Sequence, residues 1–142
     1  MEDKALELLN NLGKGNFQET LGLLFTSLDR ENYFCTAQFT VTRELTQPMG
    51  ILNGGATAGV MESIGSPLST IFIDITKEYP LGISLNVNHI RSAKIGSELL
   101  VEAKIIHVGR KTHIVRIDIK TKEGKIISTG TLTNMIMPIV NL

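Results

Sequence analysis

One carboxylate stands alone in a long uncharged part of the chain. Between Glu44 and Asp74, Glu62 is the only charged residue. A carboxylate among apolar neighbours is costly to ionise, so its pKa rises and it becomes suited to act as a base or a nucleophile. An isolated Glu can also lie on a solvated helix face or be satisfied by a hydrogen bond. Glu62 is therefore a candidate catalytic residue beside these structural interpretations.

The segment before Glu62 could stabilise a developing negative charge. Asn53, Gly54 and Gly55 open an apolar run, and two glycines allow a ligand to approach the backbone and leave N–H groups unpaired at a helix start. Such an N–H can bind the oxyanion of an acyl-transfer reaction. Two glycines can equally reflect tight packing. The combination with Glu62 and the polar Gln47 favours acyl transfer.

The spacing of these groups predicts a dimer. Gly54 and Glu62 are eight residues apart, which is about 12 Å along a helix. To act on one carbonyl, both would have to lie within about 3 Å of the reacting atoms. If they cooperate, the helices of two protomers run antiparallel, and Glu62 of one faces Gly54 of the other across a two-fold axis.

Two further polar segments carry basic side chains. Residues 88–96 read NHIRSAKIG, and residues 107–113 read HVGRKTH. Arg and Lys beside turn amides suit phosphate groups, including those of a nucleotide-bearing thioester. Turns are commonly polar, so the second segment has an ordinary interpretation of equal weight. Three histidines without paired cysteines or an HExxH spacing predict no metal site.

Hydrophobic periodicity predicts the elements that position these residues. Residues 3–12 have helical spacing, and a second, central helix is expected from residue 54 to about 73. Pro67 is expected to kink or end that helix. Six segments have the alternation of strands; these are residues 21–30, 33–41, 82–90, 99–108, 112–121 and 125–137.

One central helix cannot cover both faces of a doubly wound parallel sheet. The sequence therefore predicts an α+β fold in which an antiparallel sheet of about six strands is curled around that helix. The 142 residues suit one domain, spanning residues 1–142.

Composition excludes several classes of function. The chain has 14 Lys and Arg against 14 Asp and Glu, so its net charge is zero, which disfavours nucleic acid or an anionic membrane surface as a partner. Its single cysteine, Cys35, cannot form an internal disulfide, and no targeting segment or spanning helix is recognisable. A cytoplasmic protein is expected.

Two motifs resemble a known family. Residues 47–66, QPMGILNGGATAGVMESIGS, and residues 85–96, LNVNHIRSAKIG, closely resemble the hotdog-fold acyl-CoA thioesterases. The similarity is strongest to the branch that holds 1,4-dihydroxy-2-naphthoyl-CoA thioesterase of menaquinone synthesis, the enterobactin proofreading thioesterase and the phenylacetate-pathway enzymes. It covers nearly the whole chain, including residues 11–17 and 107–113.

This resemblance implies a fold, an assembly and a reaction. The fold is a helix wrapped in an antiparallel sheet, and the assembly is a homodimer with one continuous sheet, usually paired into a homotetramer. The reaction hydrolyses an acyl-CoA thioester to an acid and free CoA. It implies no cofactor, because CoA is part of the substrate.

The resemblance also implies residue roles. Glu62 would be the nucleophile or general base, and the Gly54 N–H would polarise the thioester carbonyl. Gln47 would orient the acyl group or water, and Ser66 would lie on the side of the acyl pocket. The residues implied to contact substrate, mainly the CoA arm, are Gly82, His89, Ile90, Arg91, Ser92, His107, Val108, Gly109, Arg110, Lys111 and Thr112.

The chain departs from the family motif at one catalytic position. That motif begins with His, and Asn53 stands there. An amide can donate a hydrogen bond and cap a helix, but it cannot move a proton near neutral pH. Three hypotheses follow: a thioesterase for aromatic or medium-chain acyl-CoA, a weakly active or non-catalytic protein that binds acyl-CoA or an acyl carrier, and a hydratase or dehydratase on the same fold. The sequence disfavours the third, because the family resemblance implies a His for that chemistry.

Overall fold

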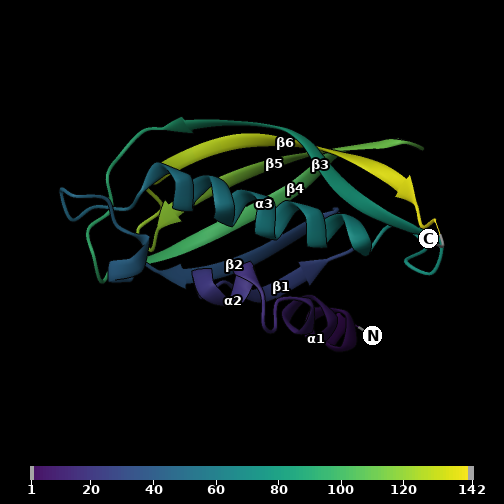
Figure 1. The fold of residues 1–142 in the computed structure, drawn as a ribbon, viewed down its shortest axis with the longest axis horizontal. Coiled ribbons are helices and arrows are strands. Elements are labelled where there is room, and N and C mark those ends of the chain that lie inside the picture. The colour runs from purple at the N-terminus through teal and green to yellow at the C-terminus, as the bar shows by residue number, and fades with distance from the viewer. Residues whose placement is uncertain (1, 141–142) are drawn as a thin grey trace.

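The computed structural model of the protein describes residues 2–140. Its centre is a six-stranded antiparallel sheet with the strand order β1-β2-β4-β5-β6-β3, and helix α3 lies along it (Figure 1). The predicted antiparallel sheet around one central helix is confirmed. The elements are α1 (Glu2–Leu12), α2 (Phe17–Leu21), β1 (Leu24–Asp29), β2 (Phe34–Thr40), a short 3₁₀ helix (Arg43–Leu45), α3 (Gly54–Thr70), β3 (Glu78–His89), β4 (Glu98–Val108), β5 (Thr112–Thr121) and β6 (Ile126–Pro138).

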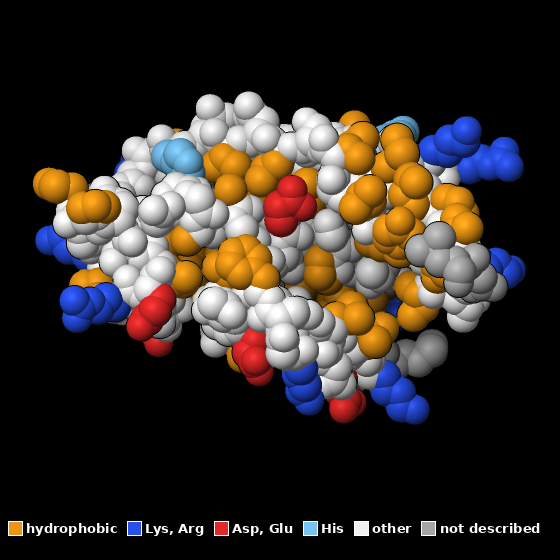
Figure 2. All heavy atoms as spheres, in the orientation of Figure 1, with side chains coloured by type: hydrophobic (Ala, Val, Ile, Leu, Met, Phe, Trp, Pro, Cys, Tyr) orange, Lys and Arg blue, Asp and Glu red, His pale blue; other side chains and the backbone are white. Residues whose placement is uncertain are grey.

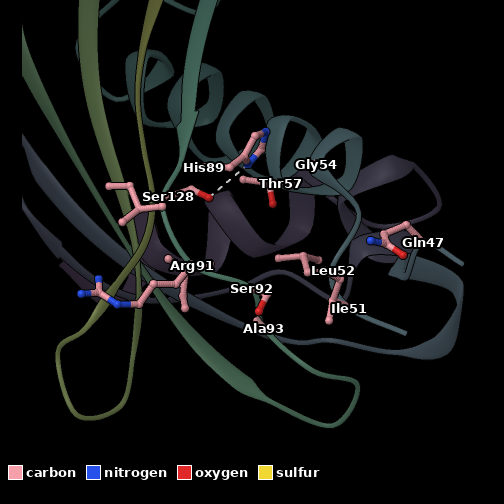
Figure 3. A pocket seen from close by; sticks show the side chains of 12 residues that line it. Gln47, Ile51, Leu52, Gly54, Thr57, His89, Arg91, Ser92, Ala93 and Ser128 are labelled. Atoms are coloured by element: carbon pink, nitrogen blue, oxygen red, sulfur yellow. Dashed lines mark hydrogen bonds between the residues drawn. The ribbon is translucent and has the colours of Figure 1, made fainter. Parts of the chain in front are cut away.

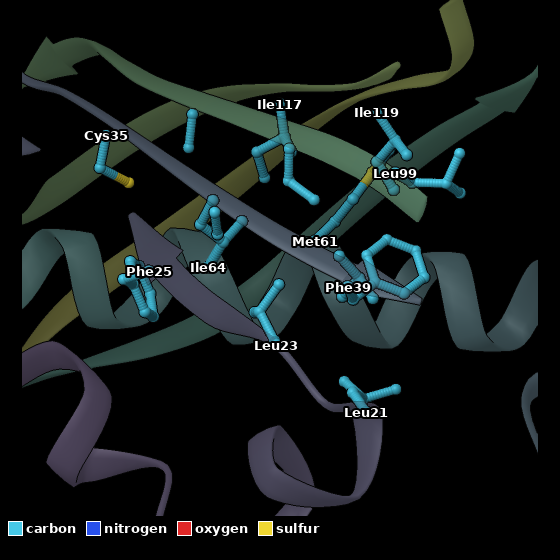
Figure 4. Packing of buried hydrophobic residues seen from close by; sticks show 14 of the residues in the cluster. Leu21, Leu23, Phe25, Cys35, Phe39, Met61, Ile64, Leu99, Ile117 and Ile119 are labelled. Carbon is cyan, nitrogen blue, oxygen red and sulfur yellow. The ribbon is translucent and has the colours of Figure 1, made fainter. Parts of the chain in front are cut away.

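Helix α3 is held against the sheet by one apolar face. Val60, Met61, Ile64 and Leu68 are completely buried and recur at helical spacing. They pack into a core to which the inward rows of β2, β4 and β5 contribute, as Figure 4 shows. The opposite face of α3 is half-exposed.

Gly65 lies at a close contact between α3 and the sheet. A Cβ atom at this position would lie 2.6 Å from Cδ2 of Leu132 in β6, which is shorter than any normal carbon contact. The residue must therefore lack a side chain for the helix to sit at its observed depth.

The two edges of the sheet differ in their surroundings. Strand β1 lies at one edge and contacts α1 (Figure 1). Strand β3 forms the other edge and pairs only with β6 among the described residues. It exposes apolar side chains, namely Tyr79, Leu81 and Ile83.

Two local predictions need correction. The sequence predicts that Pro67 kinks or ends the helix; α3 does not end there but continues to Thr70, whose hydroxyl donates to the Pro67 carbonyl at 2.5 Å. The proline is close enough to the C-terminus of the helix that few turns depend on the backbone bond it removes. The first strand begins at Leu24 rather than residue 21, because Phe17–Leu21 forms α2, capped by Asn16 and ended by Gly22 at φ 68°.

Among residues 2–140, none of the helices combines the length and the hydrophobicity that a membrane span requires.

The helix contact predicts opposite effects of two Gly→Ala substitutions in α3. Gly65→Ala places a methyl group against Leu132 and should lower the free energy of unfolding by about 1–3 kcal/mol. Gly59→Ala meets the ring of Phe17 closely and Leu21 at an ordinary contact distance of 3.7 Å; Phe17 is 55% exposed and can shift. This control should be neutral or stabilising by up to about 1 kcal/mol, because alanine favours helix. Urea unfolding of both variants measures this; equal effects would contradict the role given to Gly65.

Candidate active site

The first turn of α3 presents free backbone donors: within the described residues neither the Gly54 N–H nor the Ala56 N–H has a hydrogen-bond acceptor. Asn53 caps the helix: its side-chain oxygen accepts from the Gly55 N–H at 2.7 Å, and its own N–H donates to the Leu45 carbonyl at 2.8 Å. The Gly54 N–H has no acceptor among the residues that the structure describes. At a helix start it adds the positive end of the helix dipole to a free hydrogen-bond donor. This is the predicted oxyanion donor.

His89 lies directly over this turn. A Cβ atom at Gly54 would come within 2.9 Å of the His89 Nε2 atom. The other ring nitrogen, Nδ1, is 3.3 Å from the Ser128 hydroxyl on the neighbouring strand β6, as the dashed line in Figure 3 shows. The serine therefore fixes the ring so that Nε2 faces the start of α3.

A pocket of about 320 Å³ opens beside this turn (Figure 3). The Gln47 side-chain oxygen accepts from the Met49 N–H, which leaves the amide NH₂ free to donate. Arg91 is tied down by a 2.8 Å bond from its guanidinium to the Ile126 carbonyl. Six residues predicted from the sequence thus line one cavity: Gln47, Gly54, His89, Ile90, Arg91 and Ser92.

Glu62 lies apart from that pocket, two turns further along α3. It is half-buried against β3, where a Cβ at Gly82 would be 2.5 Å from its Oε2 atom. Figure 2 shows several hydrophobic side chains exposed on the face of the molecule on which α3 lies. Glu62 is the only acidic residue of that helix. Burial raises the pKa of the Glu62 carboxyl above its ordinary value. The carboxylate is suited to act as a base.

A buried polar group that the sequence analysis missed lies next to Glu62. Ser66, one turn beyond Glu62, donates to the side-chain oxygen of Asn134 at 3.0 Å. Asn134 is completely buried and stands opposite Gly82 in the pairing of β3 with β6. The sequence signal that could have revealed Asn134 is its position in β6. A polar amide stands there between Leu132 and Ile136 in the row of side chains that faces the core.

The second polar segment lies at the other end of α3. Val108, Gly109 and Arg110 line a separate pocket of about 600 Å³, near the last residues of the helix. The imidazole of His113 is buried there, its Nδ1 atom has no hydrogen-bond partner in the described part of the chain, and burial lowers its pKa. One chain therefore does not bring His107 to Thr112 into the pocket that holds His89 to Ser92.

An antiparallel sheet curled along one central helix is the arrangement of the hotdog fold. Residues 49–128 match the family model described as the thioesterase superfamily. The chain belongs to this superfamily, and it is a thioester hydrolase.

Similar proteins agree with this assignment. The 1,4-dihydroxy-2-naphthoyl-CoA hydrolase of Escherichia coli is 31% identical over 133 residues, 94% of this chain and 95% of that protein. A mutant thioesterase of Pseudomonas aeruginosa superposes with a TM-score of 0.88 at 32% identity, covering 94% of both chains. A thioesterase of Haemophilus influenzae gives a TM-score of 0.86 at 27% identity, covering 96% of this chain and 92% of that one.

The capping bond of Asn53 predicts how substitutions there affect stability. Asn53→Ala removes the acceptor for the Gly55 N–H and should lower the free energy of unfolding by about 1 kcal/mol. Asn53→Asp keeps an acceptor, and its charge interacts favourably with the helix dipole, so its stability should match or exceed that of the native protein. Urea unfolding of the two variants checks this; an equal loss in both would contradict the role given to the side-chain acceptor of the Gly55 N–H.

Proposed function

We propose that the protein hydrolyses an aromatic or medium-chain acyl-CoA to the free acid and CoA. The observation that carries this proposal is the half-buried Glu62 on the same helix that offers the free Gly54 N–H. The name of the Escherichia coli relative supports an aryl acyl group. The basic residues Arg91, Arg110 and Lys111 suit the phosphates of CoA.

We further propose that each active site combines two chains. Along the helix, Gly54 and Glu62 are separated by about 12 Å, too far to act on one carbonyl. Two β3 edges paired antiparallel would set the His89 end of one strand beside the Glu78 end of the other. The pocket at Gly54 would then adjoin Glu62 of the partner subunit. The same pairing would bring the partner's 107–112 segment toward His89 and Arg91.

The chemistry assigned to this arrangement is acyl transfer to water. The Gly54 N–H donates to the thioester carbonyl oxygen, and Gln47 donates from the same pocket. Glu62 either removes a proton from the water that attacks the carbonyl carbon, or attacks that carbon itself to form a mixed anhydride, which water then hydrolyses to the free acid and the regenerated carboxylate. The new C–O bond forms, the C–S bond breaks, and the CoA thiolate leaves and gains a proton. Asn53 cannot transfer protons, so Glu62 carries that task.

A pair of Staphylococcus aureus structures supports the assignment of Gln47 and Glu62. Those structures carry alanine in place of a glutamine and, fifteen positions later, of a glutamate. Gln47 and Glu62 have the same separation in this chain.

Replacing the carboxylate tests its role. Glu62→Gln keeps the size of the side chain but removes the base, and kcat for thiol release should fall on the order of 10²- to 10⁴-fold. In the native protein, activity should be lost as the pH falls through the raised pKa of Glu62, because only the ionised form acts. Glu98→Gln, on the exposed start of β4, is the matched control. Normal turnover by Glu62→Gln across aryl and aliphatic CoA esters would remove Glu62 from the mechanism.

Mixed dimers test whether the site spans two chains. Gln47→Ala and Glu62→Gln chains should each be nearly inactive alone. In a heterodimer, one of the two sites joins an intact Gln47 to an intact Glu62, so co-expression in equal amounts should restore about a quarter of native activity. If both residues acted within one chain, no site in the mixture would be complete, and activity would stay at the level of the single variants.

A further inference from the structure

Asn134 is the best-connected polar side chain within the described core. It is completely buried, and its amide makes three contacts with α3. Its oxygen is 3.0 Å from the Ser66 hydroxyl, and its nitrogen is 3.3 Å from the Gly65 carbonyl and 2.9 Å from the Ser69 hydroxyl. An amide of this kind has one oxygen to accept and two N–H groups to donate, so every one of these groups is engaged.

The Gly65 carbonyl fixes which way the amide points. A carbonyl only accepts hydrogen bonds, so the atom of Asn134 that faces it must be the nitrogen. The side-chain oxygen must then face Ser66. Because that oxygen cannot donate, the Ser66 hydroxyl must direct its proton toward Asn134. The position of the Gly65 carbonyl in α3 therefore determines that the Ser66 hydroxyl is the donor in its hydrogen bond with Asn134.

With its proton turned inward, Ser66 offers only lone pairs to its surroundings. Ser66 and Glu62 are four residues apart on a helix, so both lie on the same half-exposed face of α3. Their Cβ atoms are about 5–6 Å apart. A water molecule between them would find two acceptors at a distance that two hydrogen bonds can span.

We propose that Asn134 is a positioning residue for the hydrolysis: it holds Ser66 as an acceptor that, with Glu62, binds both protons of the attacking water. The inference rests on the proposed catalytic role of Glu62. With both protons bound, a lone pair of the water faces the thioester carbonyl. The water oxygen forms the new C–O bond, Glu62 takes one proton, the C–S bond breaks, and that proton passes to the departing thiolate.

The electrostatic surroundings of Glu62 make this arrangement sensitive to the Ser66 proton. Burial alone raises the pKa of Glu62; no charged group on α3, on the strands against it, or elsewhere in the described chain contributes to that shift. A hydroxyl that donated to the carboxylate would stabilise its charged form and lower the pKa. Asn134 prevents this by holding the proton elsewhere.

Asn134→Ala tests the inference through the pH profile of kcat. Freed from Asn134, the Ser66 hydroxyl can donate to Glu62, so the acidic limb should move to lower pH while kcat falls about tenfold, the scale of one lost hydrogen bond. Ser66→Ala should lower kcat by a similar factor without this shift to lower pH. Ser66→Thr keeps a hydroxyl and should lower kcat less than Ser66→Ala does.

Ser69→Ala is the matched control. It removes one contact of the same amide but leaves the Asn134–Ser66 bond in place, and it should keep the native pH profile. A fall in kcat for Asn134→Ala with no movement of the acidic limb would reduce Asn134 to a packing role and overturn the inference. If Asn134→Ala does not fold, equal kcat values for Ser66→Ala and native protein would overturn it instead.

A single turnover in water enriched in oxygen-18, with enzyme in excess, tests the water directly. The product acid should carry one oxygen-18 atom. A product whose new oxygen comes from Glu62 would mean that the carboxylate attacks the carbonyl itself, and the inference would fail while the proposed thioesterase function stands. Absence of thiol release by the native protein from every acyl-CoA tested would instead overturn the proposed function.

Discussion

The depth at which α3 sits against the sheet controls the rest of the structure. Gly65 permits this depth, since any side chain there would collide with Leu132. The helix consequently buries Val60, Met61, Ile64 and Leu68 on one side and leaves the other half-exposed. Glu62 lies on that second side. It is close enough to β3 to lose part of its hydration, but it stays partly exposed, so a substrate can still reach it. The same contact thus sets the packing of α3 and the partial burial of Glu62, which raises the pKa of its carboxyl.

Much of the fold was predictable from the sequence, because two periodicities are strong. Strand β5 alternates along most of its length and β4 does so from Glu98 to Ile105, and the long apolar run after Asn53 is typical of a helix. The failures are local. Helix α2 has only five residues, too few for a period, and its Asn16 and Gly22 termini were its only signals. At Pro67, tertiary packing of α3 outweighs the local penalty of proline.

The candidate site was predicted less completely than the fold. Glu62, Gly54 and Gln47 were recognisable because charge is rare in their part of the chain and glycines mark a helix start. Asn134 was missed, since its importance comes from contacts with Gly65 and Ser66 that are 69 and 68 residues away. The distance between the His107–Thr112 segment and His89 could not be predicted either. It depends on whether the turn between β4 and β5 lies at the same end of the sheet as the end of β3, and that follows from the strand order. Sequence spacing carries no information on such distances.

Two amides with different tasks flank the reactive helix. Asn53 satisfies the Gly55 N–H, while the Gly54 N–H beside the pocket has no acceptor among the described residues. Asn134 satisfies the Ser66 proton and so leaves Ser66 as an acceptor near Glu62. Neither amide titrates near neutral pH. The Gly54 N–H therefore stays a donor and the Ser66 oxygen stays an acceptor as the pH changes. Of Asn53, Asn134, Ser66 and Glu62, only Glu62 then changes its protonation state with pH. In the proposed mechanism, this single partly desolvated carboxylate therefore controls how the rate depends on pH.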